Sequence, residues 1–245
     1  MAVLFTRMAD ALIDVTMLAK RYGGRSVVRD VTVRLEPGQI IGLVGANGGG
    51  KTTTLRMLAG LLLPDTGSGR VLGESITART RHRRGDIGYM PQRLSLYPEL
   101  SVAENLRFRL RAHGFDGTKA RLAEAVERWG LESVLRTRFD RLSGGWGRRA
   151  QFAAAMLSSP RLLLLDEPTA GLDVVTRHEI WRWLEILAAQ GCGIVISTHD
   201  FTEAERCPLI LHFAGGAAER PVAPAALIAD SGTDTLEAAV AALMR

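Results

Sequence analysis

Hydrophobic and polar residues alternate along two stretches near the start of the chain, residues 12–22 and 26–35, as they do in half-buried strands. The turn sequence "EPGQ" follows, and residues 40–45, "IIGLVG", form a continuous apolar run typical of a strand buried on both faces. Beyond a glycine-rich stretch, apolar residues recur at i, i+3, i+4 and i+7 and predict an amphipathic helix. These residues are Leu55, Leu58, Ala59 and Leu62.

Strand patterns return in two further regions. Residues 64–70 are rich in turn-forming types and predict a loop, and residues 71–74 and 86–92 predict short strands after it. Residues 161–167, which include four consecutive leucines, and residues 192–198 are continuous apolar runs. Such runs are typical of parallel strands that lie inside a sheet covered on both faces.

Helical spacing dominates between these two regions, from about residue 93 to residue 159. A capping box of Ser101 and Glu104 predicts the start of one helix. A second helix carries apolar residues on one face, and Pro160 closes a third. The apolar face of the second helix consists of Leu122, Val126 and Trp129.

Helical spacing appears again towards the end of the chain. Residues 174–190 predict a helix with Ile180, Leu184 and Leu187 on its apolar face. Residues 213–230 are rich in alanine, glycine and proline and predict irregular structure, whereas residues 235–245 predict a small helix. The apolar face of that helix consists of Leu236, Val240 and Leu243. The whole pattern predicts an α/β core that a helical insert interrupts.

Length and composition agree with this outline. The chain has 245 residues, of which 47% are hydrophobic, and this suits one sizeable domain with an inserted subdomain. No apolar run reaches the roughly 18 residues of a membrane-spanning helix, and the first ten residues do not resemble a secretory signal, so we expect a soluble, cytoplasmic protein. Cys192 and Cys207 lack the spacing of metal ligands and are interpreted as small apolar fillers.

The net charge of +5 is compatible with nucleic acid, anionic lipid or nucleotides as partners. Only one basic run is dense, "ARTRHRR" at residues 78–84. It is either a solvated surface loop or a face that approaches anionic lipid head groups.

The glycine-rich stretch "GANGGGKTT", Gly45–Thr53, fits the pattern G-x-x-x-x-G-K-[ST] of a phosphate-binding loop. Its place between a buried strand and a helix gives backbone N–H groups and the helix dipole to an anion. Lys51 is positioned to reach the β- and γ-phosphates, and the Thr52 hydroxyl to ligate Mg²⁺. The stretch therefore predicts a nucleotide triphosphate site.

Two carboxylates and two other polar residues at strand ends predict the chemistry of that site. Asp166 follows four leucines and supplies a carboxylate for Mg²⁺, and Glu167 next to it is a candidate general base for an attacking water. His199 ends another apolar strand, close to the ligand crevice of an open α/β sheet, where it is able to donate a hydrogen bond to the γ-phosphate. Gln92, at the hinge into the helical insert, is expected to contact Mg²⁺ or the attacking water.

The motifs "GANGGGKTT", "MPQ", "LSGG", "LLLLDEPTAGLD" and "STHD" occur in the order and spacing of the ATPase subunits of ABC transporters, which the chain resembles from about residue 12 to residue 211. The resemblance implies an α/β fold: a P-loop NTPase core with a mixed sheet, N-terminal antiparallel β-strands and an inserted α-helical subdomain. We expect one ABC ATPase domain over residues 1–245. Its core covers about 1–93 and 160–215, its helical subdomain about 94–159, and its short tail with a helix about 216–245.

The resemblance also implies a head-to-tail dimer that holds two ATP molecules between its subunits. Each ATP lies between the Lys51 loop of one chain and the "LSGG" loop of the other, so that both loops bind the same nucleotide. The residues implied to contact ATP are Tyr22 on the adenine, Gly45, Asn47, Gly48, Gly49, Gly50, Lys51, Thr52 and Thr53 on the phosphates, Ser143, Gly144 and Gly145 from the other chain, and Asp173 at the dimer interface. Thr52, Gln92 and Asp166 are implied to hold Mg²⁺.

Two departures from the family pattern stand out. Trp146 and Gly147 follow "LSGG", where the family often has glutamine, and we expect activity to be kept. The segment after His199, "DFTEAERCPLILHFAGG", is shorter and more apolar than its usual counterpart.

"IGYMPQRLSLYPELSVAENLRF" most resembles the ATPase subunits of ABC-2 type exporters. We therefore expect an ATPase that powers export through a separate membrane-spanning permease subunit, on the cytoplasmic side of the inner membrane, paired with itself or a related ATPase. The alternatives are an importer subunit, a soluble ABC ATPase acting on nucleic acid or ribosomes, and a nucleotide sensor without hydrolysis. Glu167 and His199 disfavour the sensor. The single phosphate loop, without heptads or cysteine clusters, disfavours nucleic acid as a partner.

Overall fold

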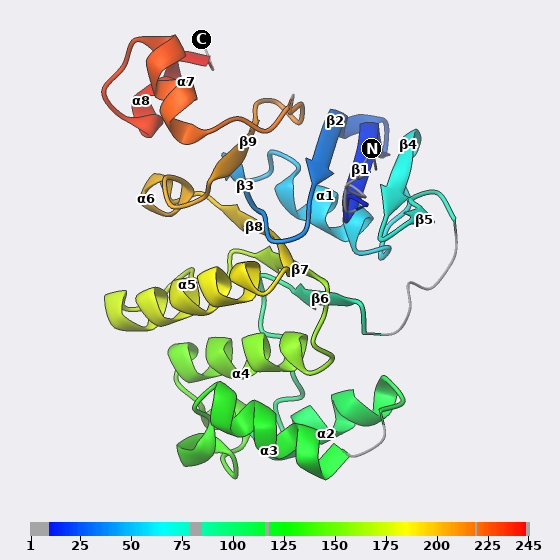
Figure 1. Cartoon of the computed structure of the whole chain (residues 1–245), viewed down its shortest axis with the longest axis vertical. Helices are drawn as coiled ribbons and strands as arrows, with labels where there is room; N and C mark the ends of the chain where they lie inside the picture. Colours follow the sequence, from blue (N-terminus) through cyan, green and yellow to red (C-terminus); the bar gives the residue numbers. More distant parts are fainter. Residues whose placement is uncertain (1–9, 79–84, 116–117, 219, 244–245) are drawn as a thin grey trace, which may run out of the picture.

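The computed structural model describes residues 10–78, 85–115, 118–218 and 220–243. Two sheets occupy the middle of the molecule, and helices extend from them at both ends (Figure 1). Most of the basic run at 78–84 lies outside the described residues. Among the described residues, no helix has the length and apolar character needed to cross a membrane.

An antiparallel sheet forms from the first half of the chain. Its strand order is β2-β1-β4-β5, with β1 and β2 where the alternating pattern predicts them. The strands are β1 (Ile13–Tyr22), β2 (Arg25–Leu35), β4 (Thr66–Val71) and β5 (Glu74–Ser75). The predicted loop at 64–70 is wrong, because most of it is strand β4. Of the predicted strand at 71–74, the first residue ends β4, the last begins β5, and the two between them form the turn. The glycines of this segment suggested a loop, but the strand itself requires them. A Cβ at Gly69 would collide with the carbonyl oxygen of Asp14 on β1.

A five-stranded sheet carries the carboxyl-terminal strand ends on which the predicted site depends. Its order is β6-β7-β8-β3-β9, and every neighbouring pair is parallel. The strands are β3 (Ile40–Gly45), β6 (Ile87–Met90), β7 (Leu162–Asp166), β8 (Gly193–Thr198) and β9 (Leu209–Phe213). The expected α/β fold with N-terminal antiparallel strands is thus confirmed, with parallel and antiparallel strands in two separate sheets.

Two helices flank this parallel sheet. Helix α1 (Lys51–Leu58) buries Leu55 and Leu58 as predicted, but it ends before Leu62 because Gly60 adopts a left-handed φ of 67°. Helix α5 (Val174–Ala189) buries Ile180, Leu184 and Leu187, as the apolar spacing predicts. Together they cover apolar faces that isolated strands would leave in water.

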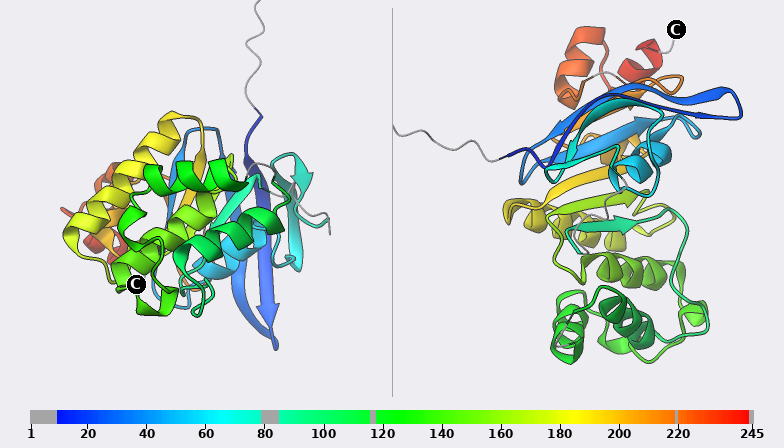
Figure 2. Two further views of the ribbon diagram at one scale, coloured as in Figure 1. Left: turned by 90° about the horizontal axis from the view of Figure 1, so that it is seen from below. Right: turned by 90° about the vertical axis from the view of Figure 1, so that its right-hand side faces the viewer.

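The chain between β6 and β7 is helical and lies at the lower end of the molecule (Figure 1). The predicted capping box is present: Ser101 and Glu104 exchange hydrogen bonds at the start of α2. The insert contains α2 (Val102–Ala112), α3 (Thr118–Arg128), η1 (Glu132–Val134), η2 (Phe139–Arg141) and α4 (Gly144–Met156). Seen from the side in Figure 2, α4 lies between the other insert helices and the sheet.

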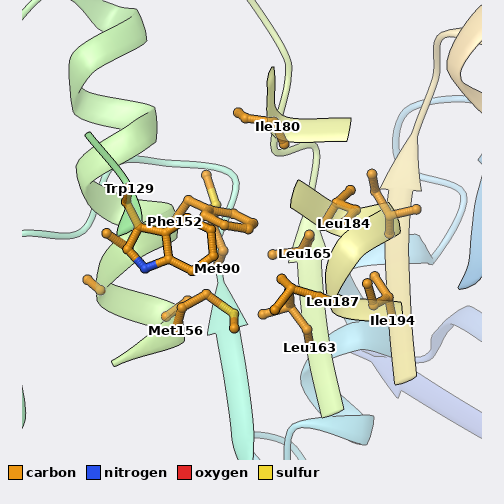
Figure 3. Packing of buried hydrophobic residues seen from close by; sticks show 14 of the residues in the cluster. Met90, Trp129, Phe152, Met156, Leu163, Leu165, Ile180, Leu184, Leu187 and Ile194 are labelled. Atoms are coloured by element: carbon orange, nitrogen blue, oxygen red, sulfur yellow. The ribbon is translucent and has the colours of Figure 1, made fainter. Parts of the chain in front are cut away.

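Aromatic packing attaches α4 to its surroundings. The Phe152 ring lies 5.1 Å from the Trp129 ring and 5.4 Å from the Trp183 ring, measured between centroids. Figure 3 shows Phe152 and Met156 on the side of α4 that faces Met90 of β6, in one buried cluster with leucines of β7 and α5. This continuous cluster couples the insert to the sheet, because buried side chains are close-packed and do not slide freely.

The last two helices, α7 (Pro224–Ser231) and α8 (Leu236–Leu243), lie at the end of the molecule opposite to the insert, as Figures 1 and 2 show. Before them in the chain come α6 (Phe201–Ala204) and strand β9, neither of which the sequence pattern predicted. The expectation of irregular structure through residue 230 is therefore wrong: Pro224 occupies the first turn of α7, where proline is well tolerated. Leu236 and Val240 of α8 are buried as predicted.

Candidate functional site

The predicted phosphate loop connects the buried strand β3 to the start of α1. Lys51 is the first residue of α1 and is 95% buried, with 5% of its surface exposed. Its Nζ donates hydrogen bonds to the carbonyl oxygens of Gly45 (2.6 Å) and Ala46 (3.0 Å). The ammonium group therefore lies across the loop, held by the backbone that it spans.

Glycine is required at both ends of this loop. Gly45 has φ +148° and Gly50 has φ +102°, which side chains rarely adopt. A Cβ would lie 2.6 Å from the carbonyl oxygen of Phe213 at Gly45, and 2.7 Å from that of Val27 at Gly50. The loop thus packs directly on β9 and β2, which fixes the backbone N–H groups at the helix start.

A pocket of about 180 Å³ opens above the loop. It is lined by Val27, Asn47, Gly48, Gly49, Gly50, Lys51, Thr52, Thr53, Gln92 and Glu167. A lysine and the N-terminus of a helix give this pocket positive potential, which suits phosphate groups. The loop, the glutamine and the glutamate that the sequence singled out therefore meet in one cavity.

Asp166 lies at the carboxyl end of β7, directly behind this pocket, and is 2% exposed. Its Oδ1 accepts hydrogen bonds from the Thr52 hydroxyl at 3.1 Å and from the Ser197 hydroxyl at 2.6 Å. Ser197 is its register partner on β8. A carboxylate and a hydroxyl in contact are the oxygen donors that Mg²⁺ prefers, so this pair fits the expected metal.

Glu167 has an unusual backbone conformation for a side chain, with φ +47°. Such left-handed residues cost about 1–3 kcal/mol and gather at functional sites. Its N–H donates to the Ser197 hydroxyl at 3.0 Å, and its carboxylate accepts from Gln92 Nε2 at 2.9 Å. His199 Nδ1 lies 3.2 Å from the other carboxylate oxygen, and the imidazole itself is half exposed.

Two cations lie within electrostatic reach of these carboxylates. Burial lowers the pKa of Lys51, while the charges of Glu167 and Asp166 oppose that shift. Burial likewise lowers the pKa of Arg148 on α4, again opposed by Glu167 and Asp166. The helical insert therefore places a positive charge near the candidate general base, a feature that the sequence did not predict.

The other predicted residues lie outside the Lys51 pocket. Tyr22 is at the tip of the β1–β2 hairpin, with 47% of its surface exposed. Asp173 caps α5, where its carboxylate accepts from the Thr176 N–H at 2.9 Å and from the Thr176 hydroxyl at 2.8 Å. These hydrogen bonds lower the pKa of Asp173 and keep it charged at the exposed start of the helix.

Ser143, Gly144 and Gly145 lie at the exposed start of α4, on the insert, and none of them lines the Lys51 pocket. Ser143 is the N-cap residue, yet its hydroxyl makes no capping hydrogen bond, so it remains available to a ligand. A Cβ at Gly144 would have no atom within 4 Å. This second glycine-rich loop is thus accessible at Ser143 and Gly144, whereas a Cβ at Gly145 would lie 3.9 Å from Leu172 and Thr176 of the same chain.

Trp146 packs within the chain through Arg149. The Arg149 guanidinium lies 4.8 Å from the Trp146 ring centroid and 5.3 Å from that of Trp183, and it pairs with Glu179 of α5. This stack of aromatic rings around a cation joins the start of α4 to α5.

Comparison with known proteins assigns the chain to a family. Residues 28–170, more than half of the chain, match the family described as ABC transporter. The chain belongs to the ABC transporter family. It is an ATP-binding subunit with ATPase activity, and the sequence resemblance is thereby confirmed.

Individual relatives of this subunit extend the agreement to most of its length. It is 41% identical to "Nod factor export ATP-binding protein I" of Paraburkholderia xenovorans (strain LB400). The alignment spans 234 residues, 94% of this chain and 77% of that protein. A solved ATP-binding subunit of an ABC transporter superposes with a TM-score of 0.83 at 28% identity, over 96% of this chain and all of that one. A bacterial ABC transporter cassette solved as a dimer superposes with a TM-score of 0.78 at 25% identity, over 86% of this chain and 98% of that one.

Proposed function

We propose that this ATP-binding subunit is the motor of an exporter, hydrolysing ATP between two subunits and driving a separate membrane-spanning partner. The observation that carries the hydrolytic part is the contact of Gln92 and His199 with Glu167 beside the Lys51 pocket. The name of the Paraburkholderia relative, an export ATP-binding protein, supports the direction of transport.

We assign the binding of phosphates to the loop after β3. Lys51 exchanges its two carbonyl partners for β- and γ-phosphate oxygens, and the N–H groups of Gly48 to Thr53 surround the phosphates. Thr52, Asp166 and Gln92 are the residues that would hold Mg²⁺. When bound, this ion supplies charge neutralisation to the phosphates. Tyr22, on an exposed hairpin tip, is assigned to the adenine ring.

Glu167 is assigned as the general base and His199 as the donor to the γ-phosphate. Glu167 accepts a proton from the water that attacks the γ-phosphorus, and Gln92, which already contacts this carboxylate, orients that water. The N–H of Glu167 donates to the Ser197 hydroxyl, and this hydrogen bond fixes the backbone from which the carboxylate extends. The half-exposed imidazole of His199 is free on its outer side to meet the phosphate.

Replacing Asp166 by asparagine tests the metal assignment. The variant loses a charge but keeps its shape, so we expect the Mg²⁺ concentration for half-maximal turnover to rise about 10- to 100-fold. Excess EDTA should abolish turnover of the unaltered protein. The measurement is ATPase rate against Mg²⁺ at fixed ATP, with the exposed Asp234→Asn as control. An unchanged Mg²⁺ dependence in Asp166→Asn would exclude this residue from the metal site.

A second subunit completes each site in this proposal. The Ser143 loop has a hydroxyl without a capping hydrogen bond and an exposed helix N-terminus, which suits the γ-phosphate held by a partner. Asp173 is exposed at the start of α5 and is assigned to the same interface. The dimeric structural relative supports such pairing.

A groove of about 250 Å³ on the helical insert is proposed as the docking site for the membrane partner. Tyr97 and Phe108 line it with their rings in edge-to-face contact at 5.1 Å, and each exposes about half of its surface. Exposed aromatic pairs are typical anchors of protein interfaces. The groove is lined by Ser95, Leu96, Tyr97, Asn105, Phe108, Arg109, Ala112 and His113.

Two buried amides connect this groove to the Gln92 loop. Gln151 of α4 accepts from Ser95 N–H at 2.7 Å and donates to the carbonyl oxygen of Pro91 at 2.8 Å. Asn105 of α2 accepts from Tyr97 N–H at 2.7 Å. We propose that these hydrogen bonds transmit motion of the groove to the residues on either side of Gln92, and that the insert, about residues 94–159, moves as one body with it.

Replacing Phe108 by aspartate tests the docking groove. A tagged chain purified from detergent-solubilised membranes should carry an integral membrane protein, and Phe108→Asp should lower that recovery at least 10-fold, because losing an aromatic anchor costs about 2 kcal/mol or more. Ile186→Asp, exposed to a similar extent on α5, is the control. Recovery of nucleic acid with no membrane protein would contradict a location at the inner membrane and favour the soluble ATPase class.

A further inference from the structure

A buried carboxylate that the proposed mechanism does not use lies behind the candidate general base. Glu203 belongs to the short helix α6 and is only 4% exposed. Its Oε1 accepts hydrogen bonds from the Thr169 hydroxyl and from Trp181 Nε1, the latter at 3.1 Å. Its Oε2 accepts from the Thr198 hydroxyl at 2.8 Å. No salt bridge among the described residues includes Glu203, so three neutral donors satisfy it.

These donors come from the two segments that carry the reacting groups. Thr169 follows Glu167 by two residues, on the segment that leads to Asp173. Thr198 immediately precedes His199, and its hydroxyl also accepts from the Asp200 N–H at 3.0 Å. One carboxylate therefore connects the segment behind the general base to the segment behind the histidine.

A cavity of about 110 Å³ borders this connection. Glu167 and His199 line it together with Thr169, Thr198 and Glu203. Across the same cavity, Arg177 of α5 pairs with Asp200 at 2.8 Å, which holds the histidine segment from its other side. Glu203 thus borders open space beyond the end of the β7–β8 ladder, where it adds a side-chain connection to the backbone contact between Glu167 and Ser197.

We propose that Glu203 is a positioning residue that holds Glu167 and His199 in their working geometry by clamping Thr169 to Thr198. The inference rests on the proposed roles of Glu167 and His199. A buried carboxylate without a cation is costly unless it is fully hydrogen-bonded, and an acceptor with two oxygens is the group that two hydroxyls and an indole N–H require. The clamp sets the 3.2 Å contact between His199 and Glu167.

Glu203→Gln distinguishes the hydrogen bonds on the two sides of the clamp, those from Thr169 and Trp181 and that from Thr198. The Trp181 N–H is a donor only, so an amide NH₂ cannot take the place of Oε1, and the glutamine oxygen must stay on that side. The NH₂ group then faces the Thr198 hydroxyl and donates to its oxygen, so the hydroxyl proton loses its acceptor and must turn away. Glu203→Gln therefore keeps Thr169 and Trp181 bound but replaces the charge-assisted bond from Thr198 with a weaker, reversed one, whereas Thr169→Val releases the other arm.

The test is steady-state ATP hydrolysis by Glu203→Gln, with Glu205→Gln, an exposed residue of the same turn, as control. We expect kcat to fall about 10- to 100-fold, the effect of misplacing reacting groups. KM for ATP should stay within about 3-fold of the unaltered value, because the phosphate loop is not touched. Thr198→Ser, which keeps the hydroxyl, should retain more kcat than Thr198→Val, and this pair serves if Glu203→Gln does not fold.

Three outcomes overturn the inference: an unaltered kcat in Glu203→Gln, a rise in KM and a loss of thermal stability that parallel the loss of kcat, or equal kcat in the two Thr198 variants. Glu167→Gln measured in the same series distinguishes the failure of the inference from that of the proposed function. If Glu167→Gln turns over normally, the proposed general base is wrong. If Glu167→Gln is inactive and Glu203→Gln is not, only the clamp is wrong.

Discussion

Replacing Glu167 with glutamine should reduce ATP turnover by at least about 100-fold, the usual contribution of a general base. The amide keeps the shape of the side chain and its contact with Gln92, but it accepts no proton from water. Nucleotide binding should be retained, because Lys51 and the loop N–H groups are unchanged. ATP that binds without being hydrolysed should then trap the closed dimer, which size-exclusion chromatography in ATP and Mg²⁺ would detect.

The matched control is Glu124→Gln, the same substitution at an exposed position of α3. It should turn over ATP at the unaltered rate and stay in its unaltered oligomeric state. Hydrolysis at a normal rate by Glu167→Gln would show that another group takes the proton. Loss of ATP binding in that variant would instead place Glu167 in the binding of nucleotide.

Gly144→Asp should abolish turnover while leaving the fold of the chain and its own nucleotide binding intact. A Cβ at this position meets no atom within 4 Å, and an aspartate at the start of α4 is favourable to the helix. Its charge, however, would repel the γ-phosphate held by the other subunit. We expect turnover to fall about 100- to 1,000-fold, as when a donor to developing charge is lost.

Ala225→Asp is the control for this substitution, since it adds the same charge to the exposed first turn of α7. Thermal unfolding and binding of a fluorescent ATP analogue should be unchanged in both variants. Only Gly144→Asp should lose hydrolysis. Loss of nucleotide binding by the isolated Gly144→Asp chain would mean that this loop serves the nucleotide of its own chain.

The sequence predicts those parts of the site that depend on local structure. The phosphate loop can be predicted because a buried strand, glycines and a helix start are consecutive in the chain. Asp166 and Glu167 can be predicted because they follow a run of leucines. His199 and Gln92 follow the same rule, since carboxyl ends of parallel strands share one edge of the sheet.

The features that the sequence did not predict depend on contacts between distant segments. Ser197 binds Asp166 because β7 and β8 are neighbours in one particular register, which no single segment encodes. Glu203 looks like an ordinary acid in the first turn of a short helix until Thr169 and Trp181 are brought to it. Strand β4 was not predicted because glycine is also typical of turns. In β4 the glycines are present because the strand lies very close to the backbone of β1.

The most direct test of a site shared between two chains mixes two inactive variants, Lys51→Ala and Gly144→Asp. In a mixed dimer, one site carries both defects and the other carries none. Random pairing makes half of the dimers mixed, each with one intact site of two, so ATPase activity should rise to about one quarter of the unaltered value. A mixture no more active than the sum of its two components would contradict the shared site.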